Sequence, residues 1–190
     1  ANDDPLESIY GVGKATGMAA PLILCPTTAG TGSEATPIAI LTTADGRKLG
    51  IVSPSLYAQW ALLDPNVTIS LPPSITAATG IDAIVHAIEA YTSARRKNPI
   101  SDMLARQALQ LLAGNMRKVI ADGHDLAARE AMLLGSHLAG VAFSNAPVAA
   151  VHALAYPLGG IFHVPHGLSN ALVLPYVLRF NAETRSEEHT

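Results

Sequence analysis

The sequence predicts two structural parts, an α/β part that ends near residue 72 and an all-α part that runs from residue 73 to residue 184. Short apolar runs of strand length alternate with turn residues from Pro21 to Pro72. From Pro73 onward the apolar residues recur at helical spacing. No internal repeat or low-complexity tract interrupts the chain, so we place a domain boundary where the pattern changes.

Four strands are expected in the first part. They are LILC at 22–25, PIAILTT at 37–43, KLGIVS at 48–53 and WALLDP at 60–65. The Asp45-Gly46 pair is expected to form the turn between the second and the third.

Five helices are expected in the second part. Ser74 is expected to cap a helix that runs to about Thr92, and Asn98-Pro99 with Ser101 opens another that continues through Met116. Three further helices are expected at 126–143, 149–158 and 167–180.

Composition excludes several classes of function. Lys and Arg number 12 against 15 Asp and Glu, a net charge of −3, so there is no basic field to hold nucleic acid. The single Cys25 excludes an internal disulfide framework and favours a reducing compartment. No signal peptide or long apolar span is evident, so we expect a cytoplasmic protein with no membrane partner.

The balance of residue types is typical of a piece of a larger protein. Charged residues make up 14% of the chain and hydrophobic residues 49%, whereas about 25% charged residues is usual. We therefore expect a fragment truncated at both ends. The hydrophilic tail at 185–190, RSEEHT, is also the translation of AGATCGGAAGAGCACACG, the start of a widely used sequencing adapter. We interpret these six residues as a read-through artefact and exclude them from the predicted fold.

Three polar residues share one stripe of the first long helix. In TGIDAIVHAIEAY, residues Asp82, His86 and Glu89 lie at i, i+4 and i+7. One interpretation is a solvated polar face. The other is that Asp82 and His86 offer a carboxylate and an imidazole to one cation.

Two later histidines favour the metal interpretation. His152 lies on a short Ala/Leu helix, and His166 starts the next helix after a Gly-Gly turn, so the chain can double back on itself. One carboxylate with three imidazoles suits a divalent transition metal such as Fe or Zn. His137 fits a hydrogen-bonded core histidine instead, and His124 has no comparable setting.

Three long motifs resemble the iron-containing, or group III, alcohol dehydrogenase family. They are PTTAGTGSE at 26–34, ATGIDAIVHAIEAYTS at 78–93 and HALAYPLGGIFHVPHGLSNALVLPYVLRFNAE at 152–183, in the order of the family. The resemblance implies the rim of an N-terminal α/β dinucleotide domain followed by an all-α C-terminal domain, as in dehydroquinate synthase-like folds, with the active site between them.

The resemblance also implies functional residues. The metal ligands of the family fall on Asp82, His86, His152 and His166. The TTAGTGSE turn and the strands after it line the cofactor in that family, which implies Thr27, Thr28, Thr31, Thr36 and Lys48. Without the resemblance, an ordinary Gly-rich hairpin and a solvated lysine explain the same residues.

The proton relay stays open. Some family members carry a second histidine four residues after the first loop ligand, where this chain has Tyr156. A phenol is a poor relay at neutral pH unless its pKa is shifted. His163 is the other candidate, and it is equally explained as a packed or ligand-supporting histidine.

The implied reaction is hydride transfer between an alcohol or aldehyde and NAD or NADP. A divalent metal acts as a Lewis acid and the nicotinamide accepts the hydride. We expect Fe²⁺, with Zn²⁺ as the alternative, a parent enzyme that forms a homo-oligomer, and little activity in the isolated fragment. The alternatives are a glycerol dehydrogenase-like or maleylacetate reductase-like relative, some of which dispense with metal, and a non-catalytic metal-binding helical domain.

Overall fold

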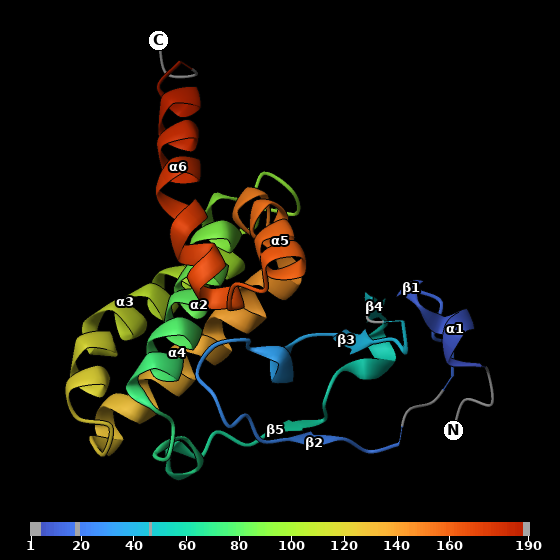
Figure 1. Ribbon diagram of the computed structural model, residues 1–190, viewed down its shortest axis with the longest axis horizontal. Coiled ribbons are helices and arrows are strands. Elements are labelled where there is room, and N and C mark those ends of the chain that lie inside the picture. Colours follow the sequence, from blue (N-terminus) through green and yellow to red (C-terminus); the bar gives the residue numbers. More distant parts are fainter. Residues whose placement is uncertain (1–4, 18–19, 46, 188–190) are drawn as a thin grey trace.

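The computed structural model describes residues 5–17, 20–45 and 47–187, without the side chains of residue 48 and residues 184–187. Helices dominate the second part of the chain, and short strands form the first (Figure 1). The predicted order of an α/β segment followed by an all-α segment is therefore confirmed.

Three long helices form the body of the helical part. They are α2 (Pro73–Thr92), α3 (Pro99–Ala121) and α4 (Leu126–Asn145). Asn98 caps α3 as predicted, since its side chain accepts a hydrogen bond from the backbone amide of Ser101. The predicted Ser74 cap is wrong, because Pro72 holds the N-cap position of α2 and makes no side-chain hydrogen bond.

The core between these helices is built largely from small residues. Fully buried alanines let α2, α3 and α4 approach closely, and the larger Leu112, Met132 and Leu133 fill the space that remains. Gly80 of α2 packs closely against this core, since a Cβ there would lie 2.4 Å from the methyl carbon of Met116 and would displace that side chain. Close packing of this kind fixes the orientation of the face that α2 presents to α5 and α6.

The last two helices follow this body, and much of α6 projects away from it (Figure 1). They are α5 (Ala150–Phe162) and α6 (His166–Glu187). The expected Gly-Gly turn is wrong, because Gly159 and Gly160 lie inside α5. The chain turns instead at His163, whose φ of 55° is left-handed and ends the helix.

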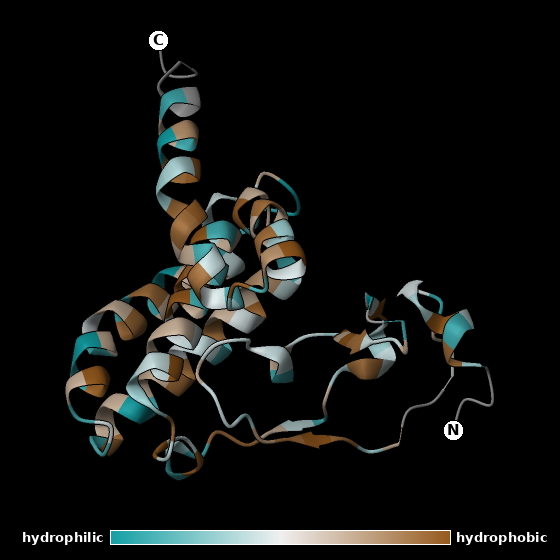
Figure 2. Cartoon of the chain, in the orientation of Figure 1, coloured by the Kyte–Doolittle hydropathy of each residue, from teal (hydrophilic) through white to brown (hydrophobic). Residues whose placement is uncertain are grey.

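Much of α5 and the first half of α6 is hydrophobic (Figure 2). Several of these side chains face solvent, among them Tyr156, Ile161 and Phe162 of α5. Among the described residues no single helix has the length and apolar character needed to cross a membrane; α4 and α5 together meet those criteria, but they meet at 108°.

The first part contains two small sheets. The first has the order β1-β4-β3, where β1 (Gly11–Val12) runs parallel to β4 (Lys48–Val52) and β3 (Ile38–Thr42) runs antiparallel to it. The second pairs β2 (Ile23–Leu24) with β5 (Trp60–Ala61) in parallel. All four predicted strands are present but shorter than expected. Gly46 of the predicted turn lies outside the described residues.

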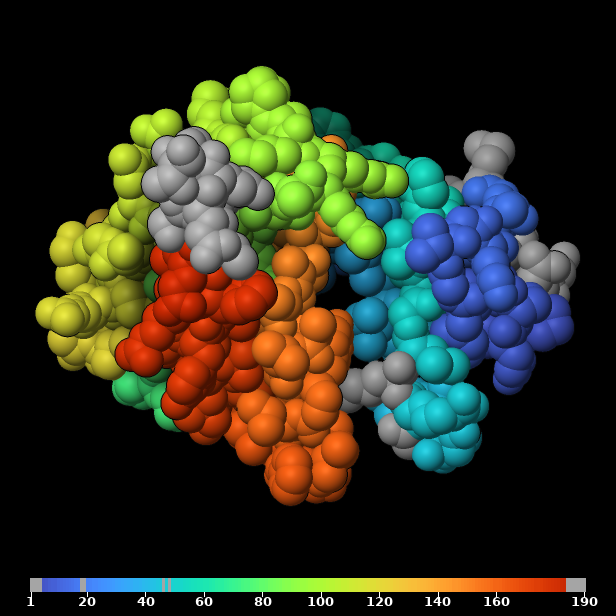
Figure 3. All heavy atoms as spheres, turned by 90° about the horizontal axis from the view of Figure 1, so that it is seen from above, coloured from blue at the N-terminus to red at the C-terminus, as the bar shows by residue number. Residues whose placement is uncertain are grey.

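Short helices and turns complete the first part. They are α1 (Leu6–Ile9), η1 (Ser33–Ala35), η2 (Pro54–Leu56) and η3 (Pro65–Thr68). The turn before η1 packs directly on α4: Gly32 has a φ of 56°, and a Cβ on Gly140 would lie 2.6 Å from the Gly32 carbonyl oxygen. Seen from above, a gap separates α5, in orange, from the strands of the first part (Figure 3).

Candidate metal centre

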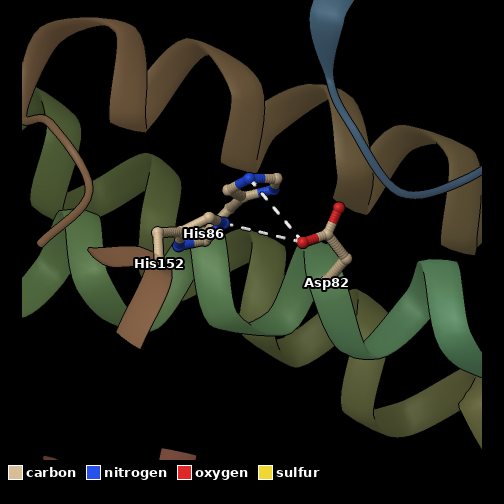
Figure 4. Close-up of side chains that lie close together, drawn as sticks. All are labelled: Asp82, His86 and His152. Carbon is tan, nitrogen blue, oxygen red and sulfur yellow. Dashed lines mark ion pairs between the residues drawn. The ribbon is translucent and has the colours of Figure 1, made fainter. Parts of the chain in front are cut away.

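The predicted polar stripe of α2 is buried. Asp82, His86 and Glu89 are 5%, 7% and 2% exposed, so the stripe is not a solvated face. It faces α5 and α6, since Glu89 bonds His152 of α5 and Asp82 bonds Asn170 of α6. Figure 4 shows the side chains of Asp82, His86 and His152 close together. Burying a carboxylate and an imidazole without partners is unfavourable, so their environment has to compensate.

Three imidazoles surround one oxygen of Asp82. The Nε2 atoms of His166, His152 and His86 lie 3.4, 3.6 and 3.9 Å from Asp82 Oδ1. Two donor atoms that are each about 2.0–2.2 Å from one ion at a tetrahedral angle lie about 3.3–3.6 Å apart. The ligand atoms of Asp82, His86 and His152 all lie within 4.8 Å of one another. The structure thus brings together all four side chains predicted as ligands.

The histidine rings are held by bonds on their far side. His152 Nδ1 donates to Glu89 Oε2 at 2.5 Å, and the second oxygen of Glu89 accepts from the backbone amide of Val151 at 2.7 Å. His86 Nδ1 donates to the carbonyl oxygen of Gly30 at 3.3 Å. These bonds direct the Nε2 atom of each ring toward Asp82, where it can bind a cation once it carries no proton.

Stacking fixes the ring planes as well. The rings of His86 and His152 stack with centroids 4.6 Å apart and planes 14° apart, and Phe143 of α4 stacks on His86 at 4.5 Å. The apolar Phe143 ring covers the side of His86 away from His152.

Asn170 is a residue of the site that the sequence interpretation did not include. Its Nδ2 donates to Asp82 Oδ1 at 2.7 Å and lies 3.4 Å from Nε2 of both His152 and His166. Glu89 was placed on the polar stripe but not in the site. A sequence signal existed for both, because Asn170 follows His166 by four residues and Glu89 follows His86 by three, so each shares a helix face with a ligand candidate.

The pKa values of the two buried histidines of the cluster shift in opposite directions. Burial acts to raise the pKa of Asp82, but the hydrogen bond from His152 and the three imidazoles hold it below its usual value. Burial lowers the pKa of His86 to about 4, so this ring is neutral at pH 7. Burial also acts to lower the pKa of His152, but hydrogen bonds to Asp82 and Glu89 outweigh it and raise it to about 9.

Of the two relay candidates, Tyr156 lies beside a histidine of the cluster. The side chain of His166 is 46% exposed, and the ring centroid of Tyr156 lies 6.1 Å from that of His166. Tyr156 is itself 60% exposed. His163 is exposed at the turn between α5 and α6. The structure therefore places Tyr156 beside the imidazole of His166.

Four of the five predicted cofactor residues lie between residues 27 and 36, in a segment whose Gly30 contacts the cluster. Thr27 and Thr31 are exposed, Thr28 is half-buried, and Thr36 is buried with its hydroxyl donating to the Ser33 carbonyl oxygen. Lys48 belongs to β4, but its side chain is outside the described atoms. Because the Gly30 carbonyl accepts the bond from His86, the turn that follows Thr28 lies against the imidazole cluster.

Two other histidines in the described part of the chain have different settings. His137 donates from Nδ1 to Oε1 of the buried Glu34 at 3.1 Å, in agreement with the interpretation as a hydrogen-bonded histidine. His124 is exposed at the start of α4.

The donor set fits a divalent transition metal. Three imidazole nitrogens and one carboxylate oxygen are the ligands that Fe²⁺ and Zn²⁺ accept. Within the described part of the chain, the buried Oδ1 of Asn170 has no hydrogen-bond partner, which is unusual unless the site takes a polar occupant.

Sequence comparison identifies the family. The model for the C-terminal region of the Fe-containing alcohol dehydrogenase family matches residues 76–189, and the iron-containing alcohol dehydrogenase model matches residues 1–65. The long-chain-alcohol dehydrogenase 1 of Geobacillus thermodenitrificans (strain NG80-2) is 52% identical over 160 residues, which are 84% of this chain and 40% of the relative.

Solved structures give the same result. A crystal structure of 1,3-propanediol oxidoreductase matches with a TM-score of 0.90 and 42% identity, covering 94% of this chain and 47% of that one. The sulfoacetaldehyde reductase of Bifidobacterium kashiwanohense in complex with NAD⁺ matches with a TM-score of 0.90 and 40% identity, covering 95% of this chain and 48% of that one.

Fold and site together define a chain whose helical part holds one aspartate and three histidines in an arrangement suited to a metal ion. The chain belongs to the iron-containing alcohol dehydrogenase family. It spans about half the length of the relatives that it matches.

Proposed function

We propose that this chain supplies the metal centre and part of the cofactor site of an NAD(P)-dependent alcohol dehydrogenase that interconverts a small alcohol and its aldehyde. The observation that carries the proposal is the convergence of three Nε2 atoms on Asp82 Oδ1 beside the Gly30 carbonyl. Asp82, His86, His152 and His166 would hold the metal.

When bound, a divalent metal supplies Lewis acidity toward an alcohol oxygen, and a nicotinamide supplies the hydride acceptor. The protein side chains contribute orientation. Glu89 keeps the Nδ1 proton on His152, so the neutral ring presents its Nε2 lone pair on the side of Asp82. The Gly30 carbonyl does the same for His86. Phe143 excludes water from one side of the cluster.

Substrate would approach on the side of His166 and Tyr156, since these two side chains are exposed while the other three predicted ligands are buried. There Tyr156 and His163 are the candidates to pass the alcohol proton to solvent. The exposed aromatic and apolar side chains nearby, Tyr156 and Phe162, accommodate an apolar alcohol, and a small hydroxy acid is the alternative substrate class.

We favour iron as the metal because the family is iron-containing, and NAD because a solved relative was crystallised in complex with NAD⁺. Zn²⁺ and NADP are the alternatives. Thr27, Thr28, Thr31, Thr36 and Lys48 are proposed to line the cofactor. We also propose a domain boundary near residue 72 and a sequencing-adapter origin for residues 185–190. The parent enzyme is proposed to be a cytoplasmic homo-oligomer without a nucleic-acid or membrane partner.

One other function has an observation in its favour. Because the imidazole cluster lies wholly within this chain, a non-catalytic metal-binding domain would have the same four side chains. It predicts metal binding without any effect of nicotinamide.

The test uses a full-length form that contains this chain. NADH fluorescence is recorded while a short primary alcohol or aldehyde is added, before and after removal of the metal with a chelator. The proposal expects turnover that is lost with the metal and restored by Fe²⁺. Metal binding with no change in NADH would favour the non-catalytic alternative. The 190-residue chain alone is expected to bind dinucleotide weakly and to turn over little.

A further inference from the structure

Asn170 occupies a position in the cluster that packing alone does not explain. It lies on α6, one helical turn after His166, and is fully buried. Its neighbour Ser169 is equally buried, but the Ser169 hydroxyl donates within its own segment, to the carbonyl oxygens of Val164 and Pro165. Asn170 reaches across to α2, 88 residues away in the sequence.

The Nδ2 atom of Asn170 is in contact with three of the predicted ligands at once. It donates to Asp82 Oδ1 at 2.7 Å and lies 3.4 Å from Nε2 of His152 and of His166. The oxygen that accepts this bond is the one that the three imidazole nitrogens face. A carboxylate oxygen has more than one lone pair, so Oδ1 can accept from the amide and still face a cation.

The other end of the amide gives an independent observation. Oδ1 of Asn170 is buried and, in the part of the chain that the structure describes, has no hydrogen-bond partner. A side chain that served only to fill space would avoid leaving a polar atom unpaired. The unpaired oxygen gives no stabilisation to the metal-free fold, so what Asn170 contributes to the cluster is its Nδ2 donor.

A neutral amide is also the suitable donor here. The ammonium of Lys or the guanidinium of Arg would place a positive charge beside a cation site, and a second carboxylate would repel Asp82 until a metal bound. An amide fixes the Asp82 carboxylate without changing the net charge of the cluster.

We infer that Asn170 is a positioning residue of the metal centre, which orients Asp82 Oδ1 toward the three histidines and so raises the affinity for a divalent metal. The inference rests on the proposed function, because it requires that the cluster binds metal. Replacing a group that supports a metal ligand typically weakens metal binding by about 10–100-fold.

The test measures Co²⁺ binding, not turnover. Chelator-treated protein is titrated with Co²⁺, and the dissociation constant and the visible d–d spectrum are recorded for the wild type and for Asn170→Ala and Asn170→Leu. Leucine keeps the approximate shape of asparagine and removes the donor, so it guards against loss of folding through a cavity. Ser169→Ala is the matched control, since it changes a buried polar neighbour that does not touch the cluster.

The inference expects about 10–100-fold weaker Co²⁺ binding and an altered d–d spectrum in both Asn170 variants, with wild-type values in Ser169→Ala. Wild-type affinity and spectrum in Asn170→Leu would overturn it while leaving the metal centre intact. Absence of saturable Co²⁺ binding in the wild type would overturn the proposed function, and this inference with it.

Discussion

Glu89→Gln tests how the site controls the tautomer of His152. In the wild type one carboxylate oxygen accepts from His152 Nδ1 and the other from the Val151 amide. Glutamine keeps the shape of glutamate but has a single acceptor oxygen. If that oxygen stays on the Val151 amide, the NH₂ group faces His152 Nδ1 and requires a lone pair there. The ring then carries its proton on Nε2, the atom that faces Asp82, and cannot bind a metal in that tautomer.

The expected magnitude follows from the geometry. The lost bond is short, 2.5 Å, buried and charge-assisted, and it supports a predicted ligand directly. Loss of such a supporting carboxylate weakens metal binding by about 10–100-fold, which corresponds to about 1.4–2.8 kcal/mol. The assay is a competition titration of Co²⁺ or Zn²⁺ against a chromophoric chelator at constant pH.

Glu130→Gln is the matched control. Glu130 lies exposed on α4, so this variant makes the same chemical change away from the cluster. We expect wild-type metal affinity for it. A Glu89→Gln variant whose metal affinity stays within threefold of the wild type would refute the argument that Glu89 sets the orientation of His152.

Three further predictions concern pH and packing. Metal-free His152 has its pKa raised from 6.5 to about 9, so it must lose a proton to bind metal. Titrations with metal at a series of pH values should therefore show metal affinity rising with pH between about 6.5 and 9, by up to about tenfold per pH unit. Gly140→Ala should lower the free energy of unfolding by more than about 1 kcal/mol in urea melts, since its Cβ would lie 2.6 Å from a backbone oxygen. Arg129→Met should lower the free energy of unfolding by about 2–4 kcal/mol in the same urea melts. The buried guanidinium donates to Thr76 Oγ1 and to three backbone carbonyls, and methionine cannot replace these bonds.

Each of these predictions has an outcome that would contradict it, and the two packing predictions have matched control variants. Affinity independent of pH over that range would contradict the raised pKa of His152. Gly114→Ala, at a helix position with open space around the new Cβ, should stabilise the protein by up to about 1 kcal/mol. Arg117→Met, at an exposed position of α3, should leave the melt nearly unchanged. Equal effects of the glycine pair, or of the arginine pair, would contradict the packing described above.

The parts of the fold that sequence predicts well are those with a local cause. Asn98 followed by Pro99 specifies the start of α3, because the cap and the fixed φ of proline act on the next turn. The end of α3 was placed five residues too early, at Met116, since the helix continues to Ala121 and stops only before Asp122 and Gly123. The turn after α5 was misplaced because Gly-Gly is a local signal, whereas His163 adopts its left-handed conformation within the folded chain.

The same distinction applies to the site. The i, i+4 spacing of Asp82 and His86 is a local pattern and could be interpreted from sequence. The bond from His86 to the Gly30 carbonyl joins residues 56 apart, and a backbone oxygen has no signature in the sequence. Asn170 and Glu89 carry ordinary polar side chains, and only the packing of α2 against α5 and α6 shows that they face the cluster.

The most direct test of the central claim is the metal content of the protein with and without its predicted ligands. Wild-type protein loaded with Fe²⁺ or Zn²⁺ is desalted and compared with Asp82→Ala and His166→Ala by elemental analysis. We expect about one ion per chain in the wild type and at least tenfold less in each variant under the same washing conditions, because each variant removes one ligand. A full complement of metal in either variant would show that the four side chains do not share a single ion.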